Sequence, residues 1–389
     1  MPPPPKSLQN RDRLRILFST LSLAIPLNLS SCASEPQKGK PAEGDRGPGK
    51  KAAGSSSAEW TEEQKMAFVE KLLREKGILD PRGWGFPKTA HEYAKLVEPD
   101  LGVPPRINLS EGVEIPLYVK GVRSFGNLGK ACDNPSLLGK DTVSGSVLQQ
   151  HEGRTADGNP LPHVVWVSFA RNSTRNPASI LGSVQMIGYN RKTGATAFFE
   201  SSDRIAPWVR LDKGTLRMRG TLPWIDNPEE FNNAFKVPDP MRPQCVQCHQ
   251  ADPFITNPFI NAAKIPGTTQ NVVPILDQDS PYYVIGGENW DMRTLHIEGN
   301  RCLDCHRVGM STLSMFMENG WKPNEHMPPR DPGSLADDLD RLLAAWKQGP
   351  TRANGALWML PPAKGKAREI VGNDYPNKAR FNQPNRTKQ

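Results

Sequence analysis

Apolar residues between positions 100 and 225 occur in short runs or alternate with polar residues, a pattern typical of β-strands. The expected strands are 113–119, 164–169, 181–189, 195–199 and 208–211. Turn-forming residues from Asn190 to Gly194 separate two of these runs, so we expect a β-hairpin there. This part has no nucleophile elbow, Gly-rich phosphate loop or paired-carboxylate spacing, and its sequence does not reveal its role.

Helical spacing of apolar residues predicts helices on both sides of this β-rich part. The first helix begins at the capping sequence Thr61-Glu-Glu-Gln64 and ends at Gly77, and a short one covers 89–97. Another short helix follows Asn227, where a proline and two acidic residues favour a helix start. An amphipathic helix is expected from Ser334 to about Gln348.

The first 58 residues have the composition of an export signal followed by a linker. Residues 1–31 combine a basic start with an apolar run that is too short to span a bilayer, which predicts a signal peptide. The boundary Leu29-Ser-Ser-Cys32 resembles a bacterial lipobox, so Cys32 is the expected lipidation site; cleavage of an ordinary signal is the alternative. Residues 32–58 are rich in Gly, Lys, Pro and Ser and predict a flexible tether.

Charge gives little indication of the binding partner. The formal net charge is +8, and removal of the leader brings it to about +5. No basic helix is interleaved with aromatic residues, so we expect no nucleic-acid partner. A basic excess in 351–389 predicts a solvated, partly disordered tail.

Two Cys-x-x-Cys-His runs carry the candidate chemistry. One consists of Cys245, Cys248 and His249, and the other of Cys302, Cys305 and His306. This is the attachment signature of a c-type haem: two thiols add to the porphyrin vinyl groups, and the imidazole binds the iron. A zinc site, two disulfides and a redox-active thiol pair are the alternatives. The histidine that follows both pairs favours haem.

Residues 242–350 therefore resemble a dihaem c-type cytochrome by motif. The resemblance implies two covalently attached haem c groups, with His249 and His306 as proximal iron ligands. Met327, in a Met-Pro-Pro loop before a helix, resembles the distal ligand of small cytochromes c. His326 competes with it, and His296 is the candidate for a bis-histidine site on the first haem.

The expected fold class is mixed α+β. A helix and then a β-rich domain of unknown role cover 59–236, and a mainly α and irregular dihaem cytochrome c-like domain follows at 237–350. No segment other than the leader suggests membrane insertion, and none is apolar enough to be a transmembrane helix.

The expected function is electron transfer by an exported protein. A lipid anchor would hold it to the bacterial cell envelope, with the outer membrane favoured by Ala33 after Cys32, facing the periplasm and its redox protein partners. A dihaem enzyme, peroxidase-like or thiosulfate dehydrogenase-like, is the first rival, and His151, His163 and Cys132 are its candidate residues. The default interpretation of Cys132 is a buried thiol that packs as a small apolar residue. The second rival is a haem-based sensor or binding protein.

Overall fold

The structure is a computed structural model that describes residues 87–136, 142–173, 182–202, 205–238, 244–287, 290–304, 306–309, 335–348, 355–372 and 375. All of them belong to the second of two compact units, Lys76–Gln389. The expected signal peptide, Cys32, the tether and the helix at 61–76 lie outside the described residues, as do His326 and Met327. No helix in the described part of the chain is long and apolar enough to cross a membrane.

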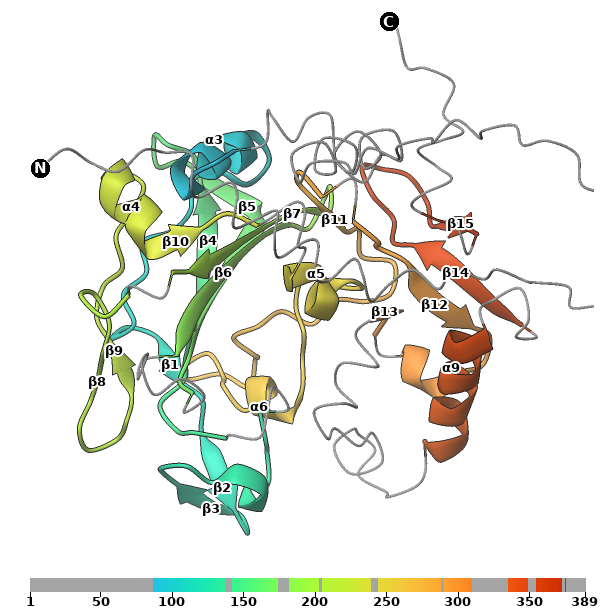
Figure 1. Ribbon diagram of the computed structural model, residues 1–389, viewed down its shortest axis with the longest axis horizontal. Coiled ribbons are helices and arrows are strands. Elements are labelled where there is room, and N and C mark those ends of the chain that lie inside the picture. The colour runs from blue at the N-terminus through green and yellow to red at the C-terminus, as the bar shows by residue number, and fades with distance from the viewer. Residues whose placement is uncertain are drawn as a thin grey trace, which may run out of the picture. The chain divides into compact units, whose positions relative to one another are not determined.

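A seven-stranded sheet forms the largest element of this unit (Figure 1). Its strand order is β1-β4-β5-β6-β7-β10, and β11 pairs with β7 in parallel. The strands are β1 (Val113–Glu114), β4 (Val147–Arg154), β5 (Pro160–Arg171), β6 (Ser183–Asn190), β7 (Ala195–Ser201), β10 (Phe235–Lys236) and β11 (Tyr283–Val284). The hairpin expected at Asn190 joins β6 to β7, where the Asn190 side chain accepts hydrogen bonds from the backbone of Lys192 and Thr193.

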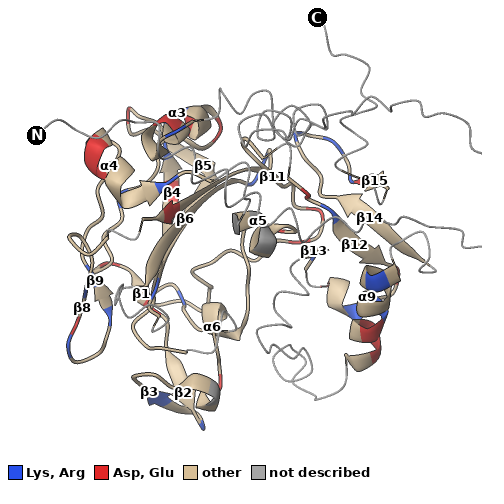
Figure 2. Cartoon of the chain, in the orientation of Figure 1, with Lys and Arg blue, Asp and Glu red and all other residues tan. Residues whose placement is uncertain are grey.

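Both faces of the sheet are buried, so alternate residues of one strand enter two different cores. Val164 and Trp166 of β5 pack in the core beneath helices α3 (Ala90–Leu101) and α4 (Pro228–Ala234). Val165 and Val167 face the other core. Thr89 and Glu92 cap α3 reciprocally, and α4 begins with two acidic residues that suit a helix N-terminus (Figure 2).

Several expected strands are shorter than the sequence pattern suggests. The run 113–119 splits into β1 and β2 (Leu117–Val119), which pairs with β3 (Val122–Ser124) in a separate hairpin. Pro116, which lacks a backbone donor, lies at the break. The run 208–211 is reduced to β8 (Arg210–Leu211), which pairs with β9 (Met218–Arg219).

The expectation of a mainly α and irregular cytochrome c-like domain at 237–350 is wrong. A second, four-stranded sheet of order β13-β12-β14-β15 joins two strands of this region to two strands from the segment 351–389, where a solvated tail was expected. Its strands are β12 (Thr294–Ile297), β13 (Val308–Gly309), β14 (Ala356–Leu360) and β15 (Glu369–Val371). Strands this short are fixed by partners distant in sequence, so their local patterns carry little signal.

The helices in the described residues of this part are short apart from the last one. They are α5 (Gln244–His249), α6 (Pro258–Asn261), the 3₁₀ helix η2 (Arg301–Asp304) and α9 (Ala336–Gln348). The observed α9 agrees with the amphipathic helix expected from Ser334 to about Gln348. Its Leu342 and Ala345 pack with Leu295 and Trp358 of the small sheet, while acidic and basic residues lie on its other sides (Figure 2).

Gly188 of β6 pairs with Trp166 of β5, and a Cβ at Gly188 would lie 2.7–2.8 Å from three ring atoms of that tryptophan. The indole is held in place because its Nε1 donates a hydrogen bond to the Leu101 carbonyl at 3.1 Å. We expect Gly188→Ala to lower the free energy of unfolding by about 1–3 kcal/mol through overpacking. Urea denaturation measures the change.

The matched control is Gly214→Ala, because a Cβ there meets nothing closer than Asp212 Oδ1 at 4.0 Å. Its effect should stay within about 0.5 kcal/mol. Equal stability of the two variants would show that the Trp166 ring moves aside without cost.

Candidate functional site

The first Cys-x-x-Cys-His run forms α5, which lies against the sheet on the side away from α3 and α4 (Figure 1). A cavity of about 260 Å³ separates α5 from the sheet. Most of its walls are apolar: the sheet supplies Leu148, Val167, Phe169, Ile187 and Phe198, and the segment after α5 supplies Phe254, Ile260 and Val273.

Cys245 and Cys248 both line this cavity, and no disulfide joins them. Burial raises the pKa of the Cys245 thiol to about 12, and the nearby Glu200 carboxylate adds to the rise. Burial also raises the pKa of Cys248 to about 11, with Arg171 opposing the rise and Glu200 adding to it. Both groups are therefore neutral thiols at neutral pH, whereas zinc ligands and redox-active pairs are stabilised as thiolates.

His249 completes the motif in the same cavity wall. Burial lowers the pKa of its imidazole to about 4, although backbone groups of Pro253 and Asp252 oppose part of the fall. The ring is neutral at neutral pH, as an iron-binding imidazole must be. Its Nδ1 is buried and makes no hydrogen bond of normal geometry, and its ring lies 5.1 Å from that of Phe198.

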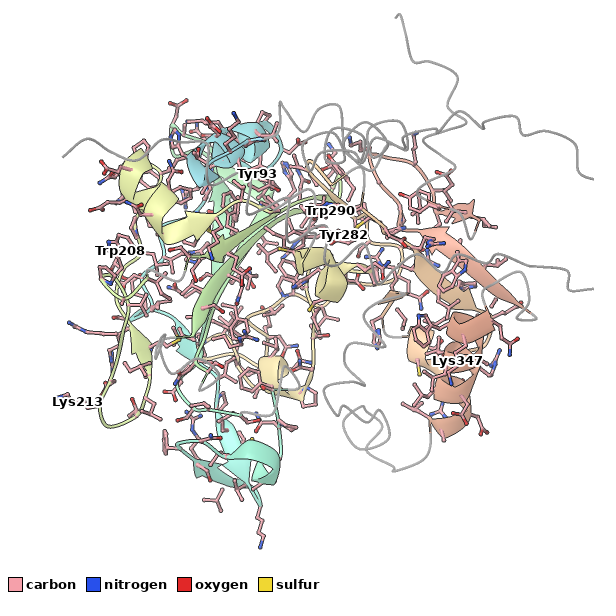
Figure 3. All side chains as sticks on the ribbon, in the orientation of Figure 1. Tyr93, Trp208, Lys213, Tyr282, Trp290 and Lys347 are labelled. Atoms are coloured by element: carbon pink, nitrogen blue, oxygen red, sulfur yellow. The ribbon has the colours of Figure 1, made fainter. Side chains whose placement is uncertain are left out.

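Tyr282 fixes the backbone at the end of α5. Its hydroxyl donates a hydrogen bond to the His249 carbonyl, and its ring packs with Phe198 and Cys245. Figure 3 shows Tyr282 next to α5, with Trp290 of the same cluster nearby. Two neutral thiols that no disulfide joins and a neutral imidazole thus border one apolar cavity, an arrangement that fits covalent haem attachment.

The second run is carried by the connection between β12 and β13. Cys302 lies in η2, where its backbone donates to the Asn300 side chain, and Asn300 donates to the Asp338 carbonyl of α9. Nδ1 of His306 lies 3.0 Å from the Arg307 carbonyl oxygen. If Nδ1 is the donor there, Nε2 keeps its lone pair for a metal. Cys305 lies outside the described residues.

Among the described residues, none of the expected distal ligands lies at the first motif. His296 is half-buried on β12, opposite Leu357, and does not line the cavity beside α5. Met327 and His326 lie outside the described residues, so their ligand roles stay predictions. Along the described cavity wall the histidine is His249 alone, and there is no methionine.

The residues suspected of catalysis also lie away from this cavity. His151 and His163, expected near loops, lie on β4 and β5. Burial lowers the pKa of His151 to about 4, with Glu111 opposing, and His163 is exposed. Cys132 is buried with Ile115 and Leu117, and its thiol donates to the Asn134 side chain at 3.3 Å, which suits the structural role expected by default.

Four polar residues of the cavity wall were not predicted from the sequence: Asn257 after α5, and three residues on the sheet. Arg171 ends β5, and Gln185 of β6 pairs with Glu200 of β7. Each lies in an otherwise apolar strand, on the same face as a cavity-lining residue two positions away. That alternation is the only sequence signal that marks them, and it does not say which face carries the cavity.

No set of three or more His, Cys, Asp or Glu side chains in the described ranges is placed to hold a metal ion directly. This result gives no support to a zinc site, and it does not bear on haem, for which the motif supplies a single iron ligand. The sequence matches no protein-family model, and searches of curated proteins and of solved structures found no match. The function of this chain is therefore inferred from its motifs and geometry.

Proposed function

We propose that this chain carries two covalently attached haem c groups and transfers electrons, as a dihaem c-type cytochrome whose fold differs from that of the small cytochromes c. The observation that carries the proposal is the joint exposure of Cys245, Cys248 and His249 to one apolar cavity. When bound, each haem would supply one-electron chemistry by cycling between ferric and ferrous iron.

The chain's own contribution is attachment, ligation and exclusion of water. Cys245 and Cys248 would hold the first haem, and Cys302 and Cys305 the second. His249 and His306 are the proposed proximal ligands. Met327 remains our first choice of distal ligand, with His326 and His296 as alternatives. The apolar wall of Val167, Ile187 and Phe198 lowers the local dielectric constant, which tunes the reduction potential of a buried haem.

We expect the paired change Cys245→Ala with Cys248→Ala to remove one haem, and Cys302→Ala with Cys305→Ala to remove the other. Haem staining after denaturing electrophoresis and intact mass measure the loss, because only thioether-linked haem survives denaturation. Cys132→Ala is the control and should keep both haems. Bound zinc without a Soret band in the wild type would overturn the proposal.

Location at the bacterial envelope is part of the same proposal. Cys32 would carry the lipid and the linker up to residue 58 would separate the haem-binding part from the membrane, where redox proteins of the periplasm are the expected partners. Labelled fatty acid should enter the wild type but not the Cys32→Ala variant. A wild-type protein without label would show that the leader is processed as an ordinary signal.

A dihaem redox enzyme, or a haem-based sensor, is the second candidate function. It is favoured by the described wall of the first cavity, which offers Arg171, Gln185 and Glu200 but no second histidine or methionine as a distal ligand. An open iron position there would admit a small molecule.

The Cys302→Ala/Cys305→Ala variant keeps only the first motif. If the second candidate function is correct, the Soret band of the reduced variant should shift when carbon monoxide is added. The Cys245→Ala/Cys248→Ala variant is the comparison for the other haem. A first haem that ignores carbon monoxide is six-coordinate and leaves electron transfer as the function.

A further inference from the structure

A buried ion pair connects the two Cys-x-x-Cys-His segments. Nε of Arg307 donates to Oδ1 of Asp252 at 3.0 Å, and Nη2 of the same guanidinium donates to the same oxygen. The Arg307 side chain is 4% exposed and that of Asp252 is 15% exposed. Solvent therefore screens this pair far less than the surface pairs of the chain, such as Arg106 with Asp226.

The guanidinium has further partners on a third segment. Nη1 of Arg307 donates to the carbonyl oxygen of Ser280 at 2.7 Å and to that of Gln278 at 3.3 Å. Burial raises the pKa of Asp252, and the charges of Arg307 and His306 oppose the rise. A buried charge pair with its remaining donors satisfied tolerates the loss of hydration, whereas removal of one partner leaves a buried charge uncompensated.

The position of the pair along the chain is its informative feature. Asp252 follows His249 by three residues, which span at most about 11 Å, and Arg307 directly follows His306. Each partner therefore lies close to a proximal-ligand histidine, and the two partners are 55 residues apart in sequence.

The segment held by Arg307 also contacts the first motif. Tyr282 lies two residues after Ser280, and its hydroxyl donates to the His249 carbonyl (Figure 3). A continuous set of bonds and hydrogen bonds thus runs from His249 through Tyr282 and Ser280 to Arg307 and His306. The hydrogen bond from Arg307 to the Asp252 carboxylate connects the same two motifs a second time.

We infer that the Asp252–Arg307 pair positions the two haem-attachment motifs as neighbours, so that electrons pass directly between the two haems within one chain. This inference rests on the proposed haem attachment. One ferrous haem would lose an electron and the ferric haem beside it would gain that electron, with no bond formed or broken and no proton transferred. Asp252 and Arg307 are positioning residues, since neither is proposed to touch iron.

An ion pair that only stabilised the fold would not have to lie beside the two proximal-ligand histidines. Arg293 and Asp291 also form a partly buried pair, with side chains 9% and 33% exposed, but its two charges are only two residues apart. The Arg293 guanidinium also donates to the Gly372 carbonyl at 3.4 Å, which belongs to neither motif. Arg293→Lys is therefore a matched control: it perturbs a buried guanidinium of the same unit without altering the connection between the motifs. Arg307→Lys makes the same chemical change in the connecting pair.

The test uses the full chain with both haems attached. Haem count comes first: two haems in wild type and variants are required. Partial reduction followed by rapid mixing or photolysis then gives the rate of electron equilibration between the haems, and EPR of the oxidised protein reports magnetic coupling between the two irons. We expect Arg307→Lys to slow equilibration on the order of tenfold and to weaken the coupling, while Arg293→Lys leaves both unchanged.

The paired change Arg307→Met with Asp252→Leu guards against misfolding, because it removes both buried charges together and need not destabilise the chain. It should slow equilibration at least as much as Arg307→Lys. Wild-type rates and EPR coupling in either two-haem variant would overturn the inference and leave the proposed function intact. A wild-type chain that attaches fewer than two haems would overturn the proposed function and the inference with it.

Discussion

Burial of both faces of the seven-stranded sheet is the constraint on which the rest of the described structure depends. Side chains alternate along a strand, so β5 sends Trp166 to one core and Val167 to the other. The first core is closed by α3 and α4 and is filled by aromatic rings such as Phe199 and Phe231. The second core contains the cavity beside α5.

The cavity in the second core indicates what this core can bind. Protein interiors are packed to high density, and an apolar cavity leaves its lining atoms without dispersion contacts on one side. A flat, apolar prosthetic group covalently held at Cys245 and Cys248 would restore those contacts and become part of the second core. In that case attachment contributes to folding as well as to redox chemistry, since a group that binds only the native state stabilises it.

The two motifs differ in how the chain holds them. Tyr282 and Phe198 fix α5 between the sheet and the segment that leads to β11, in apolar surroundings. The second motif lies in a tight connection of the small sheet, anchored through Asn300 to α9. If both motifs carry haem as proposed, the two irons would have different reduction potentials, because burial and hydrogen bonding around an iron ligand tune the potential. Arg307 connects the two motifs from a buried position, where its charge would be unfavourable without the Asp252 carboxylate.

From local spacing and turn preferences, the sequence predicted the candidate site residues, the hairpin at Asn190 and the helix at 336–348. It could not reveal the small sheet, whose strands β12 and β14 are four and five residues long and pair across 58 intervening residues. Nor could it show that Glu200 and Arg171 share a cavity with Cys248, or that Asp252 meets Arg307. Those contacts depend on how the chain folds, because strand pairing and buried charge pairing satisfy polar groups with whatever partner the fold brings near, however distant along the chain.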